Sequence, residues 1–326
     1  MSSITRRDIL AGATGAALAG IAPWSRAAEW PDHPLRLAIG YPPGGSADGV
    51  ARPLLAPLEK ALGQPVVMDY RPGAGGATAA EAVSRAAPDG YAVHLIEGSV
   101  MTALPYLRKL AFDPVKTLQP IGMAATGGVV IVAHPSLGLN SIDDLIKAAK
   151  ASPGKLSYGT SGVGGAQHLA AEQFQASTGI KMLHVPYKGG GPAMTDLVGG
   201  QIQLLFSSMT PAIPFVKSGK IKALGVTSLE RATSLPDVPT VAEQGVPGFE
   251  SIVWLAVVAP KGLPDAVARK LAAAVAAATS NPQVQSEIRM QGYEPFVEGP
   301  EALAKRIQAD SAKWSKIIKD ANISLE

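Results

Sequence analysis

The sequence predicts an α/β protein built from two lobes. Its 326 residues are enough for two lobes of ordinary domain size, and 47% hydrophobic against 17% charged residues is typical of a globular core. Short apolar, β-rich runs alternate with longer helical patterns, which favours α/β lobes with mostly parallel sheets. The sequence contains no low-complexity linker, so we expect the chain to cross between the lobes by strands, more than once.

The expected strands are short runs rich in β-branched and other apolar residues. They are Leu35–Ile39, Val66–Met68, Ala92–Ile96, Val129–Ala133, Leu183–Val185, Ile202–Phe206, Ala223–Val226 and Ile252–Val258. Helical periodicity predicts helices at Asp48–Leu62, Ala77–Ala87, Ile142–Ala151, Ala166–Thr178 and Ala193–Val198, with two closing helices at Asp265–Thr279 and Pro300–Ala321.

The first long helix, Asp48–Leu62, shows apolar residues at three- and four-residue spacing. Pro53 fits a first helical turn, whereas Pro57 predicts a kink or a later start. The helix at Ile142–Ala151 has a clearer beginning, because Ser141 can cap it and acidic residues follow in the first turn.

The N-terminus has the parts of an export signal. Basic residues precede a stretch of small apolar residues, and Ser25-Arg26-Ala27 is the best small-x-small cleavage match, so we expect residues 1–27 to be removed after Ala27. The pair Arg6-Arg7 indicates the twin-arginine route, although adjacent arginines also occur by chance near signal starts. Removal takes away three arginines and one aspartate, so the net charge falls from +3 to +1. Any affinity for anions must therefore be local.

The composition also excludes several classes of protein. The chain has no cysteine, which excludes disulfides, thiolate metal sites and a lipid-modified cysteine. Aromatic residues are 5% and do not alternate with basic runs, which argues against a nucleic-acid surface. After residue 27 no apolar run approaches the roughly 20 residues that span a bilayer. We expect a soluble periplasmic protein without a lipid anchor.

Glycine-rich turns join expected strands to expected helices at four places. They are Tyr41–Gly49, Arg71–Thr78, Gly159–His168 and Pro186–Met194. Glycines let the backbone approach a ligand closely, and helix N-termini present unpaired N–H groups with partial positive charge. Such turns are also the usual joints of α/β sheets, but four in one chain favour a cleft that binds an anion. None ends in Gly-Lys-Ser/Thr and none fits Gly-x-Gly-x-x-Gly, so neither a nucleotide nor a dinucleotide is expected.

Polar side chains in these turns are candidate ligand contacts, each with a structural alternative. Thr160, Ser161 and Gln167 are small donors, and Lys188 can reach a carboxylate or lie in solvent. His168 faces the ligand or packs as a polar core residue. Asp48 is a candidate base, but at a helix start it is more typical of a capping acid. Arg71 is expected to pair with Asp69 or Asp89 instead of a ligand.

We find no pattern typical of catalysis. Two turns approach the Gly-x-Ser-x-Gly nucleophile motif and both lack its final glycine, and no His-Glu-x-x-His motif occurs. We therefore expect no catalytic residues, no metal and no cofactor. A periplasmic hydrolase or isomerase that uses Ser161 and His168 stays open as an alternative.

The glycine turns and the segments around them resemble the Bug receptors, the periplasmic solute-binding proteins of tripartite tricarboxylate transporters. The resemblance rests on Tyr41–Asp48, Gly63–Gly76, Ala151–Tyr158, His184–Gln201, Ala223–Ser228, Leu235–Gly245 and Trp254, in that order. It implies a two-lobed, type II periplasmic binding protein that closes on a small carboxylate, with residues 28–125 plus about 252–326 in lobe 1 and residues 126–251 in lobe 2.

In that family the strand–loop–helix units of both lobes hold the carboxylate, largely with backbone N–H groups. Carried over, Tyr41–Asp48 (loop A) and Thr160–His168 (loop B) are the two sides of the clamp, and Pro186–Gly191 and the turn after Phe206 complete the wall. The implied ligand-binding residues are Tyr41, Gly44, Gly45, Ser46, Ala47, Asp48, Thr160, Ser161, Gly165, Gln167, His168, Lys188, Ser207 and Thr210.

One departure concerns the ligand. Many relatives carry an acid directly after the strand that ends at Phe206, where this chain has Ser207 to Thr210. Loss of that acid favours a plain or aromatic carboxylate over an amino-bearing one. The expected function is a monomeric receptor that delivers an organic acid to a membrane transporter, or, alternatively, a sensor subunit that acts on a membrane kinase.

Overall fold

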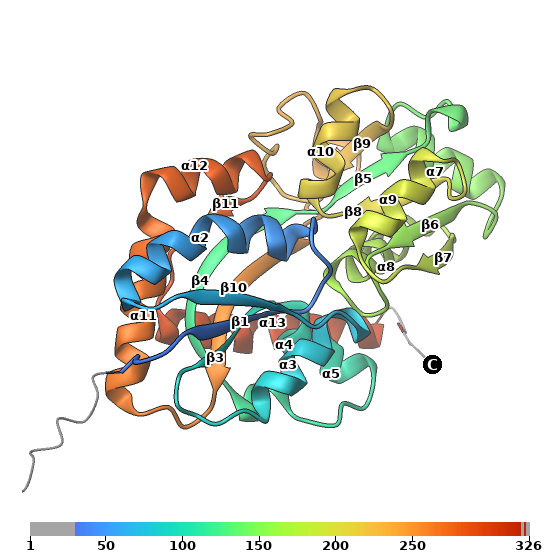
Figure 1. Cartoon of the computed structure of the whole chain (residues 1–326). Helices are drawn as coiled ribbons and strands as arrows, with labels where there is room; N and C mark the ends of the chain where they lie inside the picture. The colour runs from blue at the N-terminus through green and yellow to red at the C-terminus, as the bar shows by residue number, and fades with distance from the viewer. Residues whose placement is uncertain (1–29, 321–322, 324–326) are drawn as a thin grey trace, which may run out of the picture.

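The structure is a computed structural model, and it describes residues 30–320 and 323 (Figure 1). The export signal expected at residues 1–27 lies outside the described residues. Two β-sheets with flanking helices form two lobes joined by neighbouring segments, which confirms the two-lobed α/β fold class. Within the described part of the chain, every helix is too short or too polar to cross a membrane.

Lobe 1 contains a six-stranded sheet in the order β11-β4-β10-β3-β1-β2. Its strands are β1 (Leu35–Ile39), β2 (Val66–Tyr70), β3 (Ala92–Glu97), β4 (Leu118–Gly128), β10 (Ile252–Pro260) and β11 (Glu294–Pro295). Strands β1, β2 and β3 pair in parallel, whereas β10 pairs antiparallel with both β3 and β4. The helices of this lobe are α2 (Ser46–Leu62), α3 (Ala77–Ser84), α4 (Ser99–Thr102), α5 (Leu104–Leu107), α6 (Pro114–Thr117), α11 (Asp265–Ser280), α12 (Pro282–Met290) and α13 (Pro300–Asp320), with a 3₁₀ turn η1 (Ala74–Gly76).

Lobe 2 contains a five-stranded sheet in the order β7-β6-β8-β5-β9. Its strands are β5 (Val130–Ala133), β6 (Ser157–Thr160), β7 (Leu183–Pro186), β8 (Leu204–Ser207) and β9 (Lys222–Val226). Strands β6, β7 and β8 pair in parallel, and β5 pairs antiparallel with β8 and β9. Its helices are α7 (Ile142–Ala151), α8 (Ala166–Thr178), α9 (Gly190–Val198) and α10 (Met209–Lys217), with 3₁₀ turns η2 (Pro135–Leu137) and η3 (Ala242–Gln244).

Both sheets are therefore mixed, and the expectation of mostly parallel pairing holds only for three strands in each lobe, which include the four that carry the glycine turns. The reason lies in the crossings between lobes. Strand β4 runs out of lobe 1 directly into β5, and β10 returns beside it, so the two crossing strands are antiparallel neighbours. The chain first passes from the sheet of lobe 1 to the sheet of lobe 2 between Gly128, where β4 ends, and Val130, where β5 begins. The expected lobe boundaries at residues 125/126 and 251/252 stay a prediction.

Four hydrogen bonds made by Thr227 connect the two crossings. Its hydroxyl accepts from the Val129 N–H at 2.7 Å and donates to the Ser251 carbonyl at 2.6 Å. Its backbone N–H and carbonyl pair with the same two residues at 2.9 Å each. Thr227 is fully buried, so this junction between the lobes has no direct access to water.

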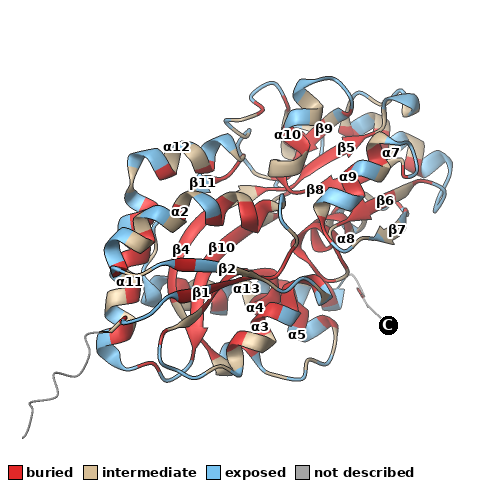
Figure 2. Ribbon diagram, in the orientation of Figure 1, coloured by how far each residue is buried: buried red, intermediate tan, exposed pale blue. Residues whose placement is uncertain are grey.

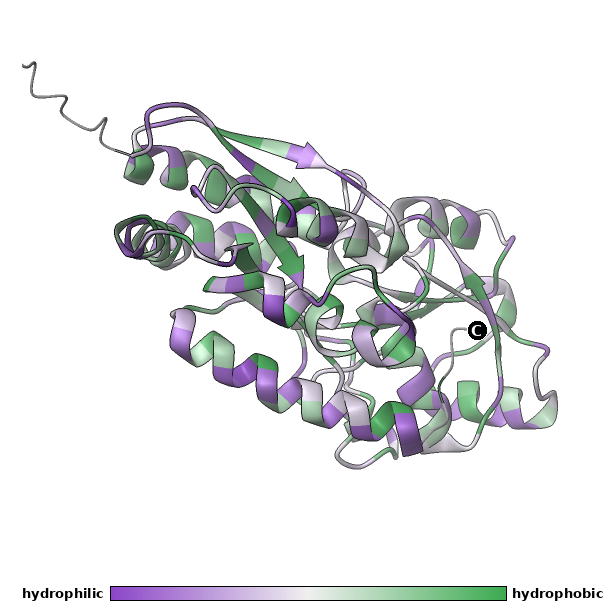
Figure 3. Ribbon diagram, turned by 90° about the horizontal axis from the view of Figure 1, so that it is seen from below, coloured by the Kyte–Doolittle hydropathy of each residue, from purple (hydrophilic) through white to green (hydrophobic). Residues whose placement is uncertain are grey.

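The core of each lobe lies between its sheet and the helices, as the buried strands and half-exposed helices show in Figure 2. Seen from below in Figure 3, the helices carry alternating apolar and polar stripes over apolar strands. Helix α2 begins at Ser46, earlier than expected, and contains both Pro53 and Pro57 in its interior. The expectation that Pro53 sits in the first turn is wrong. The capped start of α7 is confirmed, since the Ser141 hydroxyl accepts from the Asp144 N–H at 3.0 Å.

Candidate ligand-binding cleft between the lobes

Loops A and B have the same local structure in opposite lobes. In loop A, Gly44 has φ +82° and its N–H donates to Oδ2 of Asp48 at 2.9 Å. In loop B, Gly164 has φ +78° and its N–H donates to Nδ1 of His168 at 3.2 Å. In both loops an extended glycine then precedes the helix, Gly45 before α2 and Gly165 before α8. The positive φ values explain why glycine is needed at both turns.

The Asp48 side chain holds the shape of loop A by hydrogen bonds. It is 5% exposed, and besides Gly44 it accepts hydrogen bonds from Nε of Arg52 at 2.9 Å and from the hydroxyl of Tyr70. Burial alone would raise the pKa of Asp48, but hydrogen bonds from Arg52, Tyr70 and the Gly44 N–H outweigh it and hold the pKa below the usual range. Asp48 is thus an ionised brace of the loop.

His168 plays the same part in loop B, because it accepts from the glycine N–H four residues before it, as Asp48 does in loop A. Its ring stacks on His184 with centroids 4.1 Å apart, and Nε2 of His184 lies 2.7 Å from the Thr160 hydroxyl. Burial lowers the pKa of His168 to about 4. Burial and the neighbouring His168 lower the pKa of His184 to about 4 as well. A neutral imidazole is the form that accepts from the Gly164 N–H, so this stacked pair holds loop B without charge.

The starts of α2 and α8 offer unused donors. Among the described residues, the N–H groups of Gly45, Ser46 and Ala47 donate no hydrogen bond, and neither do those of Gly165 and Gln167. Gly44 is different, because its N–H is already bonded to Asp48. Two helix N-termini from opposite lobes therefore present free N–H groups beside the interlobe space.

Glu97, the last residue of β3, reaches this space from lobe 1. It is 2% exposed, and its Oε1 accepts from the Ala166 N–H of α8 at 2.9 Å, the Ser99 hydroxyl at 3.2 Å and the Tyr41 hydroxyl at 3.2 Å. Burial raises the pKa of Glu97, and these hydrogen bonds only partly oppose the shift. The first residue of α8 is thereby bonded to a carboxyl group of the other lobe.

Two chambers lie between the lobes. The outer chamber has a volume of about 220 Å³ and is lined by the glycine turn Gly73–Gly76, by Ser161–Val163, and by Arg108 and Lys188 from opposite lobes. The inner chamber has a volume of about 10 Å³, roughly the space of one water molecule. It is lined by Tyr41, Pro42, Pro43, Gly45, Ser46, Glu97, Ser161, Gly190, Gly191 and Ser208.

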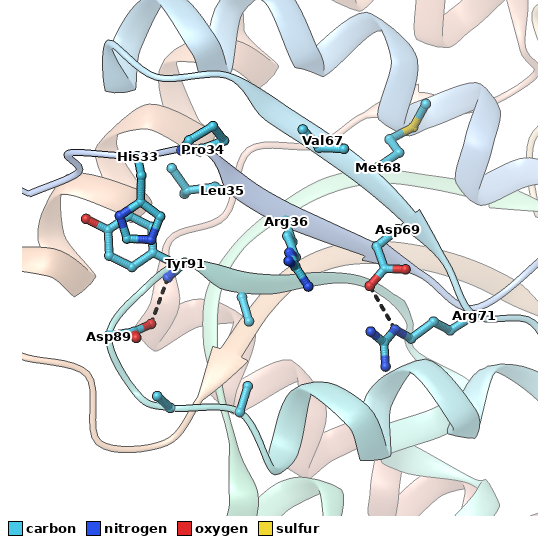
Figure 4. A pocket seen from close by; sticks show the side chains of 13 residues that line it. His33, Pro34, Leu35, Arg36, Val67, Met68, Asp69, Arg71, Asp89 and Tyr91 are labelled. Atoms are coloured by element: carbon cyan, nitrogen blue, oxygen red, sulfur yellow. Dashed lines mark hydrogen bonds and ion pairs between the residues drawn. The ribbon is translucent and has the colours of Figure 1, made fainter.

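A larger hollow lies outside the space between the lobes. Figure 4 shows it at the β2 edge of lobe 1, where Arg36, Asp69, Arg71 and Tyr91 surround a space of about 810 Å³. The expected pairing of Arg71 with Asp69 is confirmed here, with Nε and Oδ2 2.8 Å apart. All residues that line this hollow belong to lobe 1, so closure of the lobes does not enclose it. We place the ligand site in the two interlobe chambers, where both lobes contribute.

The structure brings only part of the sequence-predicted set to the chamber walls. Tyr41, Gly45, Ser46, Ser161 and Lys188 line a chamber. Gly44, Ala47, Asp48, Thr160, Gly165, Gln167, His168, Ser207 and Thr210 do not. Most of these lie directly behind the wall, within loops A and B.

Ser207 and Thr210 have other partners. The Ser207 hydroxyl donates to the Ser208 carbonyl at 2.8 Å, and its neighbour Ser208 is the residue that lines the inner chamber. The Thr210 hydroxyl donates to the Gln291 carbonyl at 3.2 Å, which joins α10 of lobe 2 to the turn after α12 of lobe 1. Thr210 thus makes a contact between the lobes.

Sequence reasoning missed Glu97 and Arg108. The signal for Glu97 was available: an acid closes the apolar run Ala92–Ile96 and is followed by Gly98, the same strand-to-turn arrangement as the other loops. Arg108 carried no comparable pattern. Its guanidinium donates to the Ala74 carbonyl at 2.7 Å, so its place depends on the fold of the glycine turn.

The pair needed for the hydrolase alternative is not formed. The Ser161 hydroxyl donates to Oε1 of Gln167 at 2.6 Å, while Nδ1 of His168 accepts from the Gly164 N–H. A serine nucleophile needs its hydroxyl within reach of a base, and here each group is bonded to a different partner.

The model of the family described as tripartite tricarboxylate transporter family receptor matches residues 50–323. The chain belongs to this receptor family. Among curated relatives of the receptor, BugT of Bordetella pertussis is 34% identical over 312 residues, which cover 95% of this chain and 96% of BugT. The resemblance to the Bug receptors is therefore confirmed.

Two solved structures resemble the receptor closely. A protein of R. palustris with adipate is 32% identical with a TM-score of 0.87, and the match covers 91% of this chain and 99% of that one. MatC from Rhodopseudomonas palustris with bound malate is 29% identical with a TM-score of 0.83, covering 89% and 100%. The receptor shares with both the fold of a solute-binding protein.

Proposed function

We propose that this receptor captures a small organic carboxylate between its two lobes outside the inner membrane and delivers it to the membrane subunits of a tripartite transporter. The observation that carries the proposal is the matched pair of loops A and B, which present free N–H groups from the starts of α2 and α8. Helix N-termini of this kind bind anions. Adipate and malate, present in the two structural relatives, are both carboxylates.

Closure of the lobes is the proposed mechanism. A ligand that bridges loops A and B gains contacts in the closed arrangement that it lacks in the open one, and this difference shifts the population toward closure. One helix N-terminus contributes about 0.3–1 kcal/mol to an anion, and up to about 2 when partly buried. Two termini with direct hydrogen bonds approach the roughly 8 kcal/mol of a micromolar complex.

The contacts divide into two proposed roles. Tyr41, Gly45, Ser46, Ala47, Ser161, Gly165, Gln167 and Lys188 face the ligand, while Gly44, Asp48, Thr160 and His168 hold the loops in shape. Ser207 and Thr210 belong to the surrounding wall. The support for this division is that the first group lines a chamber or carries a free N–H at the start of α2 or α8, whereas hydrogen bonds within the loops occupy the second group.

The receptor performs no chemistry on its ligand in this proposal, and it acts as a monomer. Delivery to a transporter is the favoured role because of the family, and a sensor kinase is the alternative partner. Residues 1–27 are proposed to direct export by the twin-arginine route. Replacing Arg6 and Arg7 together by lysine should block the appearance of the mature protein in the periplasm; unchanged export would contradict the route.

Thermal unfolding with a panel of adipate, malate, benzoate, aspartate and glucose tests the ligand class. At ~100 times its Kd a ligand adds about 2.7 kcal/mol to stability, so the melting temperature should rise with at least one carboxylate. A shift with glucose alone would overturn the carboxylate assignment. Chromatographic recovery of the unchanged ligand after long incubation tests for catalysis, and turnover that disappears in Ser161→Ala would overturn the receptor-only function.

A further inference from the structure

The carboxyl group of Glu97 is bonded in an asymmetric way. Its Oε1 accepts from the Ala166 N–H and the Ser99 hydroxyl, and it lies 3.2 Å from the Tyr41 hydroxyl, whose single proton is shared with the Gly75 carbonyl at 3.0 Å. Its Oε2 is equally buried but has no hydrogen-bond partner among the described residues. An ionised carboxylate has acceptor capacity on both oxygens, whereas a neutral carboxylic acid has one accepting oxygen and one O–H donor. The arrangement is the one that suits the neutral acid, with the proton on Oε2.

Among the described residues, no charged side chain of positive sign is recorded against Glu97, and the partial positive charge of the α8 N-terminus reaches only Oε1, through the Ala166 N–H. The titratable neighbours are Tyr41, from the turn after β1, and Tyr293, from the turn before β11. Burial and the nearby Glu97 raise the pKa values of both hydroxyls, so both stay neutral. The cations Arg108 and Lys188 line the outer chamber and are absent from the lining of the inner one.

The Tyr293 hydroxyl is a second unsatisfied group at the same depth. It is buried without a hydrogen-bond partner among the described residues, like Oε2 of Glu97. Buried polar atoms without partners are rare in folded proteins and cost about 1–3 kcal/mol each. Glu97 lines the inner chamber, and Tyr293 lies next to Ser46 and Ser208 of its wall, so the unpartnered Oε2 marks a place where a ligand group can complete the hydrogen bonds. With the Ser46 and Ser208 hydroxyls in the wall, that chamber presents donors to an acceptor.

We propose that Glu97 is the specificity-determining residue of the cleft, a neutral carboxylic acid whose Oε2–H donates a hydrogen bond to a carboxylate oxygen of the ligand. The inference rests on the proposed function, since it assumes that the ligand is a carboxylate. Two carboxylates at hydrogen-bond distance in a buried site share one proton, because like charges there disfavour double ionisation. The receptor that carries an ionised Glu97 must therefore take up one proton from solvent when it binds.

The competing arrangement is an ionised Glu97 that pairs with the ammonium group of an amino acid. The uneven distribution of hydrogen bonds over the two oxygens favours the neutral acid, as does the absence of a recorded cation among the described side chains that face Glu97. The two arrangements predict opposite proton balances. An ammonium that pairs with an ionised Glu97 brings its own proton and requires no uptake.

Titration calorimetry between pH 6.5 and 9 separates these arrangements, because His168, with a pKa of about 4, stays neutral in this range. Adipate is the carboxylate probe and aspartate the amino-bearing probe. For wild type we expect the proton uptake per adipate, measured in buffers of different ionisation enthalpy, to grow from near zero where free Glu97 is neutral to close to one where it is ionised. Above the pKa of Glu97 in the free receptor, Kd should rise by about tenfold per pH unit.

Glu97→Gln is the informative variant, since an amide keeps one acceptor and one donor but cannot ionise. We expect it to bind adipate with a Kd that is independent of pH and with no proton uptake. Glu298→Gln, the same change at an acid that pairs with Arg306 far from the chambers, should keep the wild-type pH dependence.

The outcomes are distinct for the two claims. If the Kd for adipate is independent of pH in wild type while Glu97→Gln weakens adipate binding by tenfold or more, or if Glu97→Gln keeps a wild-type rise of Kd with pH, the neutral-acid role is wrong while the receptor function stands. If aspartate binds without proton uptake and Glu97→Gln weakens it by a hundredfold, Glu97 is an ionised partner of ammonium. If no carboxylate binds wild type at any pH in this range, the proposed function fails and the role of Glu97 fails with it.

Discussion

Gly75 of lobe 1 lies directly against the Val163 carbonyl of lobe 2. A Cβ atom built on Gly75 would lie 2.8 Å from that oxygen and 3.3 Å from the Gly165 nitrogen, closer than real Cβ atoms approach backbone. The two glycine turns therefore touch backbone to backbone, and the closeness of the lobes depends on the missing side chain.

Gly75→Ala should hold the lobes apart. The new methyl group meets backbone instead of a flexible side chain, and φ of +64° adds strain of roughly 1–2 kcal/mol. We expect at least a tenfold higher Kd for adipate by titration calorimetry, about 1.4 kcal/mol. Gly138→Ala is the matched control, since φ is +66° there and the Cβ meets open space. An unchanged Kd in Gly75→Ala would show that closure tolerates the methyl group.

Thr227→Val should weaken the junction of the lobes. The change keeps the shape but leaves the Val129 N–H without its side-chain acceptor and the Ser251 carbonyl without its hydroxyl donor, at about 1–3 kcal/mol for each buried group. Chemical denaturation should show a loss of about 2–4 kcal/mol. Thr279→Val is the control, because the Thr279 hydroxyl is buried with no hydrogen-bond partner among the described residues. It should be neutral or stabilising, and equal losses in both variants would contradict the role of Thr227.

Asp48→Ala should lower affinity through the shape of loop A. The Gly44 N–H, Arg52 and Tyr70 lose their common acceptor, so stability should fall by about 1–3 kcal/mol and Kd for adipate should rise by about tenfold. Asp113→Ala removes the acid that caps α6 outside the cleft, and it should cost about 1 kcal/mol of stability with no change of Kd. Parallel denaturation and calorimetry measure both effects. A normal Kd in Asp48→Ala would mean that the loop holds its shape without the brace.

Acid should destabilise the receptor through its buried histidines. Burial lowers the pKa of His94 to about 4, as it does for His168, while the unfolded chain has the ordinary value of 6.5. As pH falls from 6.5 towards 4, the unfolded chain takes up protons that the folded chain does not. The free energy of unfolding should therefore decrease by up to about 1.4 kcal/mol per pH unit for each histidine. Above pH 6.5 this contribution is fully present.

Denaturation curves at several pH values measure that slope. His168→Gln keeps an acceptor for the Gly164 N–H and removes one titrating group, so its slope should be smaller than that of wild type. His33→Gln changes an exposed histidine on the surface and should keep the full slope. Identical slopes in all three proteins would exclude His168 from the acid response.

The sequence predicted the parts of the fold whose signals are local. Helices α7 and α8 occur at the expected residues, because Ser141 caps one and glycines bound the other at both ends. Strand β4 was missed because Leu118–Gly128 contains a proline and three glycines, which obscure a strand pattern. The strand is buried because it pairs with β10, which lies more than a hundred residues later in the chain. Helix α10 was missed because Pro211 and Pro214 lie within it.

The residues of the candidate site likewise fall into those that the sequence could predict and those that it could not. Loops A and B were recognisable from their glycines, since positive φ and close backbone approach leave few other residues possible. The strand-to-turn pattern at Glu97 is visible in the sequence, but its contact across the cleft is not, because its partner Ala166 belongs to the other lobe. The role of an acid at the end of a strand is decided by what the second lobe places opposite it, and that information is tertiary.

The paired crossings joined by Thr227 are the segments about which the two lobes can rotate relative to each other. Two neighbouring antiparallel segments allow the lobes to open and close but resist sliding and twisting of one lobe against the other. The angle between the lobes then depends on whether the cleft holds a ligand. A membrane partner that contacts the outer faces of both lobes can respond to the angle between them without contacting the ligand.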